Sequence, residues 1–338
     1  MKKVISIVAL FALLCAMLTP ALAEGAIKRI GTLKMLNMSE QDYASVQKLR
    51  CIAGEMLNEE HIPAENPYYD GMLDDNPEII YYDSLNDMVM ALNGNQIDAI
   101  DLNYSTAKYL CDRNDGLKMM LDYSDTENNI LTDFIFNSLL SFDFSLMLPK
   151  ASQDLTDEIS EILLVMEEDG TLDMLAETYI DGDIGKAPVA ELPVIEGAET
   201  LRVAVTGDLP PMDYVTPDGQ PAGFNVAVLA EIGKRIGRNI ELVPISTSAR
   251  AMALASKQVD AVFWSRSCMA FQDVVNEGLD WKDLFAPEDE GDEALMAKID
   301  EVLMPSFDYP NYGTKDIPAN LIVTQRYYSD CIVLVTKK

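Results

Sequence analysis

Two arginines in the second half of the chain have surroundings that suit the binding of a negatively charged group. Arg250 begins a segment of helical pattern. Arg266 lies between Ser265 and Ser267 at the end of a strand-like run, and Trp264 just before them offers an aromatic surface. A guanidinium group binds a carboxylate through two parallel hydrogen bonds and fixes its orientation. Each arginine is also explained by a solvated surface charge or a salt bridge, so both interpretations stay open here.

Other polar and aromatic side chains follow strand-like runs in short loops that lead into predicted helices. These side chains are Asp208, Met212 and Tyr214 in the second half, and Asn37, Ser39, Asn103 and Ser105 in the first half. In open parallel sheets the ligand crevice lies beyond the carboxyl ends of the strands, where helix N-termini present amides and a partial positive charge. The loops therefore predict a site for a small polar ligand that carries a carboxylate. Helix capping alone also accounts for Ser39 and Ser105.

Other kinds of site lack the residues they need. The chain has one histidine, His61, and its cysteine spacings match no zinc pattern, so neither a metal nor another cofactor is expected. The cysteines after the N-terminal segment are Cys51, Cys111, Cys268 and Cys331. With two in each half, pairing within each half is the most economical of three connectivities. Asp208 and Asp101 are the acids near the loops, and neither has an evident partner for acid–base catalysis.

An internal repeat defines the elements that must position these loops. Residues 90–99 read MALNGNQIDA and residues 252–261 read MALASKQVDA. Each copy is predicted to be a strand, a helix and a second strand, at 78–82, 85–92 and 97–102 in the first half and at 240–245, 249–254 and 259–264 in the second. Such βαβ units imply parallel sheets with right-handed crossovers.

The flanking segments extend each copy into an open α/β lobe. We predict first strands at 29–36 and 201–206, helices at 39–57 and 225–236, and a strand and amphipathic helix at 143–148 and about 155–166. The expected architecture is α/β, with two open parallel-sheet lobes, a hinge and an interlobe cleft. The expected boundaries are a lobe at 27–182, a linker at 183–200, and a lobe at 201–338 that carries an acidic insertion at about 280–320.

The N-terminal segment indicates the compartment of the protein, and the net charge bears on its binding partners. Lys2 and Lys3 precede an apolar run at 4–18, and Ala23 ends a small-residue cleavage site. The pattern predicts a signal peptide at 1–23, with cleavage near Ala23 and export to the periplasm or the cell exterior. The run is shorter than the roughly twenty residues of a membrane span. The 25 basic and 56 acidic residues give a net charge of −31, which disfavours nucleic acid as a partner. A monomer is expected.

Several runs occur in the order and spacing of a known protein family. In the second half these are LRVAVTGDLPPMDY at 201–214, DG at 218–219, GFN at 223–225 and QVDA at 258–261. The chain resembles the type II periplasmic solute-binding proteins of the amino-acid-binding class (family 3) of ABC transporters. EDGTLDMLAETY at 168–179 is similar to the family's closing phrase, and the strand at 327–335 looks like its crossing strand. The resemblance implies closure of two lobes on a small polar ligand and delivery to the membrane subunits of an ABC importer.

The lobes come in the opposite order to the family. Residues 27–182 resemble its second lobe and residues 201–338 its first. We interpret this order as a circular permutation, which surface chain termini tolerate. Two incomplete copies of the family are the alternative.

The residues that contact ligands in the family are altered here. Gln272 stands where the family has its carboxylate-binding arginine, so Arg250 and Arg266 are the candidate replacements. Asn103 stands where the family has an aspartate, and an amide brings no counter-charge for an ammonium group. Met212 stands where an aromatic residue usually closes over the ligand. The ligand's identity therefore stays open. A ligand sensor and a dehydratase-like enzyme on the same fold are the alternatives to transport.

Overall fold

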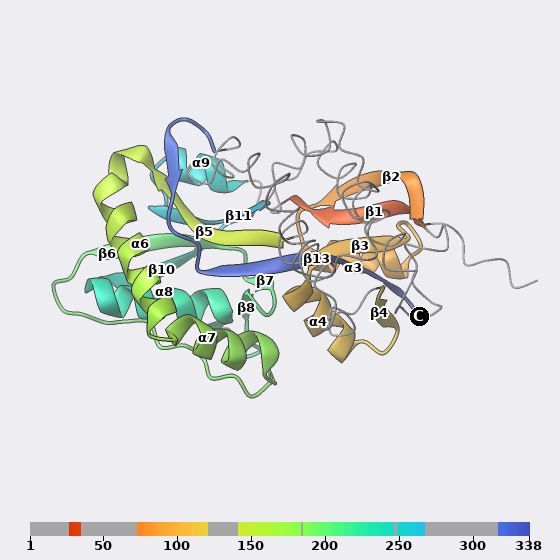
Figure 1. Cartoon of the computed structure of the whole chain (residues 1–338), viewed down its shortest axis with the longest axis horizontal. Helices are drawn as coiled ribbons and strands as arrows, with labels where there is room; N and C mark the ends of the chain where they lie inside the picture. The colour runs from red at the N-terminus through yellow and green to blue at the C-terminus, as the bar shows by residue number, and fades with distance from the viewer. Residues whose placement is uncertain (1–26, 35–72, 121–140, 184, 247–248, 268–316) are drawn as a thin grey trace, which may run out of the picture.

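The computed structural model describes residues 27–34, 73–120, 141–183, 185–246, 249–267 and 317–338 (Figure 1). The predicted signal peptide, the predicted helix at 39–57 and the acidic insertion up to residue 316 lie outside these residues. Cys51 and Cys268 also lie outside them, so the predicted cysteine pairing stays a prediction.

One lobe, called the N-lobe here, is built on three parallel strands. Its elements are β1 (Ile27–Leu33), β2 (Leu73–Tyr82), α3 (Leu85–Asn93), β3 (Ala99–Asn103), α4 (Tyr104–Arg113) and β4 (Leu117–Met119). β1 lies between β2 and β3 and pairs with both in parallel. α3 begins at Ser84, whose hydroxyl oxygen accepts the Asp87 N–H, and it buries Leu85, Met88 and Leu92 against the sheet.

The other lobe, called the C-lobe here, repeats this arrangement and adds elements to it. Its elements are β5 (Ser141–Pro149), the 3₁₀ turn η4 (Lys150–Ser152), α6 (Gln153–Glu168), α7 (Thr171–Ala176), the π-helical turn η5 (Glu177–Asp181), β6 (Thr200–Val205), β7 (Asp208–Leu209), β8 (Asp213–Val215), β9 (Pro221–Ala222), α8 (Phe224–Ile236), β10 (Asn239–Pro244), α9 (Arg250–Ala255), β11 (Ala261–Ser267) and β12 (Leu321–Val323). β6 lies between β10 and β11, parallel to both.

The structure confirms the two predicted βαβ units and shows what the repeated aspartate does. In both lobes the first strand is central, the second strand lies on one side and the third on the other. Asp98 accepts the backbone N–H of Arg29 and its guanidinium group, with Nη2 and Oδ1 2.6 Å apart. Asp260 binds Arg202 in the same way, at 2.8 Å. The aspartate therefore ties the first strand to the start of the third in each lobe.

Two antiparallel strands lie at the junction of the lobes, and one of them pairs with strands of both lobes. Residues 328–331 of β13 (Tyr328–Lys337) pair with β5 of the C-lobe, whereas residues 332–335 pair with β3 of the N-lobe. Figure 1 shows β13 running from one lobe into the other beside β5. The result is one continuous sheet with parallel strands in each lobe and antiparallel strands between them. The predicted α/β class is confirmed.

The boundary between the lobes differs from the expected one. β5 pairs with β11, and α6 and α7 pack on α8, so residues 141–182 belong to the C-lobe and not to a lobe at 27–182. The second half of β13 likewise belongs to the N-lobe. The physical reason is long-range strand pairing, which local periodicity does not record. Residues 185–199, in the expected linker, form neither helix nor strand. The Asn239 side chain accepts the backbone N–H of Ile195 and donates to its carbonyl oxygen, which attaches this segment to the C-lobe.

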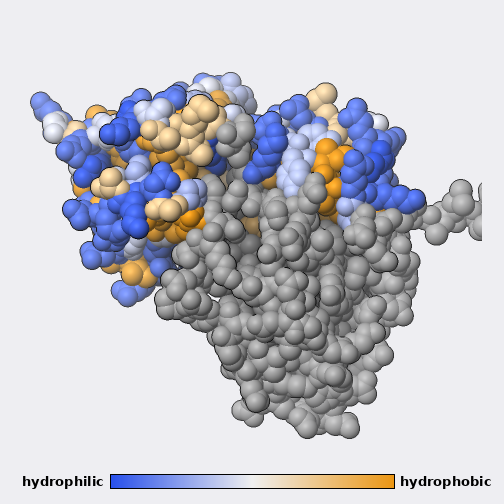
Figure 2. All heavy atoms as spheres, turned by 90° about the horizontal axis from the view of Figure 1, so that it is seen from above, coloured by the Kyte–Doolittle hydropathy of each residue, from blue (hydrophilic) through white to orange (hydrophobic). Residues whose placement is uncertain are grey.

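The described surface is mainly hydrophilic, with small apolar patches (Figure 2). The exposed large apolar side chains include Met90, Met174 and Met252. In the part of the chain that the structure describes, no helix combines the length and the apolar character that crossing a membrane requires.

Candidate ligand-binding site

Arg250 is the buried cation of the C-lobe. Its side chain begins α9 and is 5% exposed. Nη1 donates to the carbonyl oxygen of Phe263 at 3.1 Å, while Nε and Nη2 have no hydrogen-bond partner among the described residues. Burial lowers the pKa of the guanidinium group, and the negative charges of Asp213 and Asp208 act against this shift. The side chain therefore holds a poorly compensated positive charge beside β11, close to the end of β6.

Asp213 organises the loop that follows β6. Its Oδ1 accepts the backbone N–H groups of Thr206 and Gly207, each at 2.8 Å, and also the Thr206 hydroxyl. Its Oδ2 accepts Asn225 Nδ2 at 3.1 Å, and Asn225 Oδ1 accepts the Tyr327 hydroxyl at 2.8 Å. Both carboxylate oxygens of Asp213 thus accept hydrogen bonds from other groups of the protein, and these bonds hold the loop next to Arg250 in place.

A glycine lets this loop approach the start of α8. The backbone N–H groups of Phe224 and Asn225 donate to the carbonyl oxygens of Pro211 and Met212, at 3.0 and 2.8 Å. Gly223 adopts a φ of 112°, and a Cβ there would lie 2.5 Å from the Met212 oxygen. Only glycine fits this position, which explains the Gly-Phe pair in the sequence.

Asp208 is the half-buried acid of the loop. Burial raises the pKa of its carboxyl group, and the neighbouring Asp213 raises it further. A hydrogen bond from Thr206 and the charge of Arg250 act in the opposite direction. Asp208 and Arg250 are therefore close enough to interact electrostatically, and they present a carboxyl group and a cation to the same region.

The N-lobe faces this loop with the first turn of α4. The Ser105 hydroxyl approaches Met212 Sδ at 3.8 Å, and α3 contacts β7. Asn103, at the end of β3, is 6% exposed, makes no capping hydrogen bond, and leaves Nδ2 without a partner among the described residues. The Ser105 N–H, which an N-cap side chain could bind, donates instead to Asp330 Oδ2 at 3.0 Å. The amide of Asn103 is thus available for another group.

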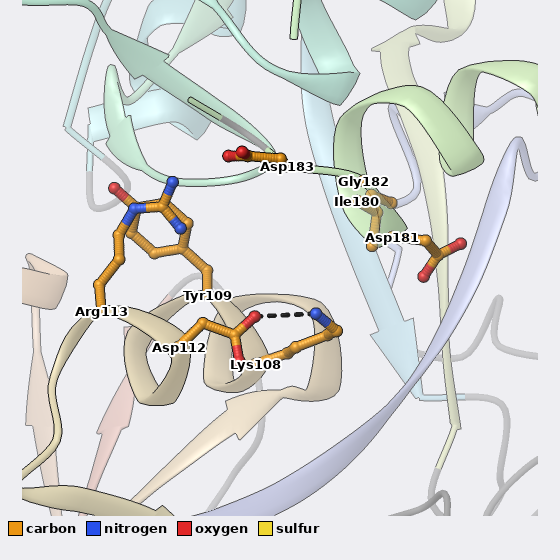
Figure 3. Close-up of a pocket in the computed structure, with 8 residues that line it drawn as sticks. All are labelled: Lys108, Tyr109, Asp112, Arg113, Ile180, Asp181, Gly182 and Asp183. Atoms are coloured by element: carbon orange, nitrogen blue, oxygen red, sulfur yellow. Dashed lines mark hydrogen bonds and ion pairs between the residues drawn. The ribbon is translucent and has the colours of Figure 1, made fainter. Parts of the chain in front are cut away.

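A cavity of about 510 Å³ lies between the lobes (Figure 3). Lys108, Tyr109, Asp112 and Arg113 of α4 form one wall, and residues 180–183 form the other. The guanidinium carbon of Arg113 lies 4.3 Å from the centre of the Tyr109 ring, and Lys108 pairs with Asp112 at 2.8 Å. Burial raises the pKa of Tyr214, and its neighbour Tyr109 raises it further. These charged groups are largely exposed, so we place the candidate ligand site at Arg250 instead.

The predicted residues separate into three groups. The structure describes the surroundings of Asp208, Met212, Tyr214, Arg250, Asn103 and Ser105. Asn37 and Ser39 lie outside the described residues, as do the side chains of Trp264, Ser265, Arg266 and Ser267, although their backbone forms β11. Met212 is 1% exposed and packs in the core, so its main role is structural.

The sequence did not indicate a role for Asp330, nor did it indicate the series of hydrogen bonds that connects Asp213, Asn225 and Tyr327. The sequence feature that could have indicated Asp330 is a single acid just before the apolar run CIVLV.

Buried polar side-chain atoms without a partner occur, among the described residues, on Asn103, Ser145 and Arg250. Within the same described part, no group of histidine, cysteine or acidic side chains is placed to hold a metal ion.

Residues 201–267 match the bacterial extracellular solute-binding proteins, family 3. The matched segment contains the loop after β6, the start of α8 and the whole of α9, and so includes Asp208 and Arg250. No curated protein matches the sequence.

Solved structures with similarity to the chain include three binding proteins. The ligand-binding component of an ABC-type import system from Staphylococcus aureus, with zinc bound, has 9% identity and a TM-score of 0.38, over 92% of this chain and 66% of that one. The periplasmic aliphatic sulphonate binding protein SsuA from Escherichia coli has 10% identity and a TM-score of 0.34, over 93% and 62%. AgaA from A. tumefacien R10, in complex with agropinic acid, has 12% identity and a TM-score of 0.35, over 80% and 57%. The chain spans less than two thirds of each of these proteins.

Proposed function

We propose that this protein is an exported solute-binding protein that holds a small carboxylate-bearing ligand between its lobes and delivers it to an ABC importer. The observation that carries the proposal is the buried guanidinium group of Arg250, with two nitrogens unpartnered among the described residues. The family match supports it, because residues 201–267 include this arginine and the neighbouring loop.

The energetics of Arg250 favour a ligand. Burying a cation costs several kcal/mol unless a partner compensates, and each unsatisfied buried donor costs about 1–3 kcal/mol. Asp213 already accepts hydrogen bonds from Thr206, Gly207 and Asn225, so it compensates Arg250 only through its charge. A ligand carboxylate that accepts from Nε and Nη2 would satisfy both nitrogens in the bidentate geometry that guanidinium groups prefer.

The opposite wall suits a second polar group on the ligand. Asn103 offers an amide N–H from the N-lobe, where the α4 cap is already supplied by Asp330. Because the N-lobe and C-lobe contact each other at Ser105 and Met212, a ligand bound by Arg250 and Asn103 would hold the lobes together.

An amino acid is one ligand class within this proposal. Its carboxylate would bind Arg250, and its ammonium group would take Asp208 as counter-charge, since Asn103 has none to offer. An organic acid without an amine needs only Arg250 and Asn103. The ligand panel described below separates these two classes.

The order of the lobes supports the interpretation of a circular permutation. The segment that matches the family, 201–267, follows the N-lobe in the chain. β5, α6 and α7 precede it in sequence, yet they pack on the same lobe. Permutation accounts for a lobe whose parts lie on both sides of residues 183–200. Export after cleavage near Ala23 and a monomeric state complete the proposal, and both rest on the sequence.

Thermal unfolding with a panel of amino acids, organic acids and amines tests the proposal. At a ligand concentration of 100 times Kd, binding stabilises the folded state by about 2.7 kcal/mol, which raises the Tm by several degrees. We expect at least one carboxylate-bearing compound to do so, and Arg250→Met to abolish the shift. Arg238→Met is the matched control, because Arg238 pairs with the exposed Glu199. A panel without any response contradicts the proposal, and chemical conversion of the ligand would identify an enzyme instead.

A further inference from the structure

Asp330 lies where β13 passes from one lobe to the other. In this strand Asp330 is paired with Phe142 of β5, whereas Ile332 is already paired with Asn103 of β3. The Asp330 side chain is 6% exposed. A carboxyl group in such a position is costly to bury, and packing of the strand does not require it.

The Asp330 carboxylate binds the first turn of α4 and so links the hinge strand to both lobes. The Ser105 N–H donates to Asp330 Oδ2 at 3.0 Å, and the Ser105 hydroxyl approaches Met212 Sδ at 3.8 Å. Ser105 belongs to the N-lobe and Met212 to the C-lobe. If α4 moved away from the C-lobe, Ser105 would separate from Met212 and water would reach Asp330.

The titratable groups that interact with Asp330 are Asp181 of η5 and Tyr328 of β13 itself. Tyr104 of α4 and the Cys331 side chain in turn act on Tyr328. Burial raises the pKa of Asp330 to about 7, and the negative charge of Asp181 adds to the increase. The hydrogen bonds from Ser105 lower the pKa but do not offset the burial.

We propose that Asp330 makes the arrangement of the two lobes depend on proton binding. The arrangement described here is favoured while Asp330 holds a proton, and separation of the lobes is favoured once Asp330 is ionised. The reason is that an ionised carboxylate gains more from hydration than a neutral one, so the state that buries it binds the proton more tightly and becomes more populated as the pH falls. Asp330 is a positioning residue, and the proposal holds whatever the ligand is.

Small-angle X-ray scattering of the unliganded protein between about pH 5 and pH 9 tests the coupling. We expect the radius of gyration of the wild type to increase as the pH rises toward about 7, the pKa of Asp330 in the arrangement described here, and to level off above that pH. Asp330→Asn has nearly the same size and keeps an acceptor for the Ser105 N–H, but it stays neutral. Its radius should equal the wild-type value at low pH and should not change with pH.

Two further variants make the test specific. Asp143→Asn alters another buried acid of the joining strands, whose carboxylate accepts the Ser329 hydroxyl, and it should keep the wild-type response. Asp181→Asn removes the neighbouring negative charge and should move the midpoint to lower pH. A wild-type radius independent of pH, or a pH response retained in Asp330→Asn, overturns the proposal. If Asp330→Asn does not fold, an unchanged midpoint in Asp181→Asn overturns it.

Discussion

Replacement of Arg250 by methionine separates a ligand-binding role from a structural one. Methionine matches the length of the aliphatic part of arginine and removes the guanidinium group from its buried position. A structural arginine would be needed for folding in the absence of ligand. A ligand-binding arginine instead lowers the stability of the unliganded protein, because its charge is poorly compensated and two of its nitrogens have no hydrogen-bond partner among the described residues.

The magnitude follows from the contacts of Arg250. The variant loses one hydrogen bond to the Phe263 carbonyl oxygen, which contributes about 1.5–3 kcal/mol for a charged donor. It also loses attraction to Asp208 and Asp213, which partly offsets the burial of the charge. The variant no longer has the desolvation penalty of the buried cation, which is several kcal/mol. It also no longer has two unsatisfied donors, which cost about 1–3 kcal/mol each. We therefore expect the free energy of unfolding to stay unchanged or to rise by up to about 3 kcal/mol.

Urea unfolding of the unliganded protein, followed by circular dichroism, measures this difference. The control Arg238→Met removes a partly exposed arginine that pairs with Glu199, and such surface changes usually alter stability by less than about 0.5 kcal/mol. A loss of more than about 2 kcal/mol in Arg250→Met would refute the reasoning, because it would make Arg250 the counter-charge that Asp213 needs for folding.

The remaining predictions concern the opposite wall, the repeated ion pairs and the buried hinge acid. Asn103→Asp should weaken binding of an acid without an amine and strengthen binding of an amino acid, as isothermal titration calorimetry would show. Burial raises the pKa of the Asp98 and Asp260 carboxyl groups, but their arginine partners outweigh this effect and lower it overall. Asp98→Asn and Asp260→Asn should therefore lower the Tm at pH 7, and this effect should disappear in acid, once the pH falls through the lowered pKa values and the wild-type carboxylates lose their charge. Asp330→Asn should raise the Tm at about pH 8.5 and leave it unchanged near pH 4, because the raised pKa of Asp330 reduces wild-type stability as the pH rises from about 4 to 7.

The parallel units were predictable because their information is local. The phrases at 90–99 and 252–261 predicted a helix and a following strand in each lobe, and α3, β3, α9 and β11 confirm them. Their boundaries differ by up to three residues, as expected where helix ends and strand starts depend on pairing. The equal roles of Asp98 and Asp260 show that the repeat extends to the ion pair that closes each unit.

The lobe boundary was not predictable from periodicity. β5 and α6 have the pattern of a strand and an amphipathic helix, which the sequence indicated. Nothing in that pattern says which sheet the strand joins. β5 joins β11 in the C-lobe because their antiparallel register places Val262 opposite Met147, and both pack with Leu254 of α9. Such pairings between distant segments exist only in the folded chain.

The residues of the candidate site were named from the sequence, and whether they bind a ligand stays a prediction. The loops after the strands named Asp208, Arg250 and Asn103, because strand ends and helix starts can be recognised in the sequence. The sequence left open whether Arg250 is a surface charge, and it assigned no role to Asp330. Burial and hydrogen-bond partners decide both questions, and neither property has a local signature.

By itself, then, the sequence determined the two βαβ units and the α/β class, and it predicted the loops that we propose bind a ligand, since each depends on residues close together in the chain. Only the tertiary structure decided that β5 and α6 belong to the C-lobe, that Arg250 is buried with two nitrogens unpartnered among the described residues, and that Asp330 joins the hinge to α4. These features depend on segments that are distant in sequence and meet only when the parallel strands of both lobes assemble with the antiparallel strands β5 and β13 into one sheet.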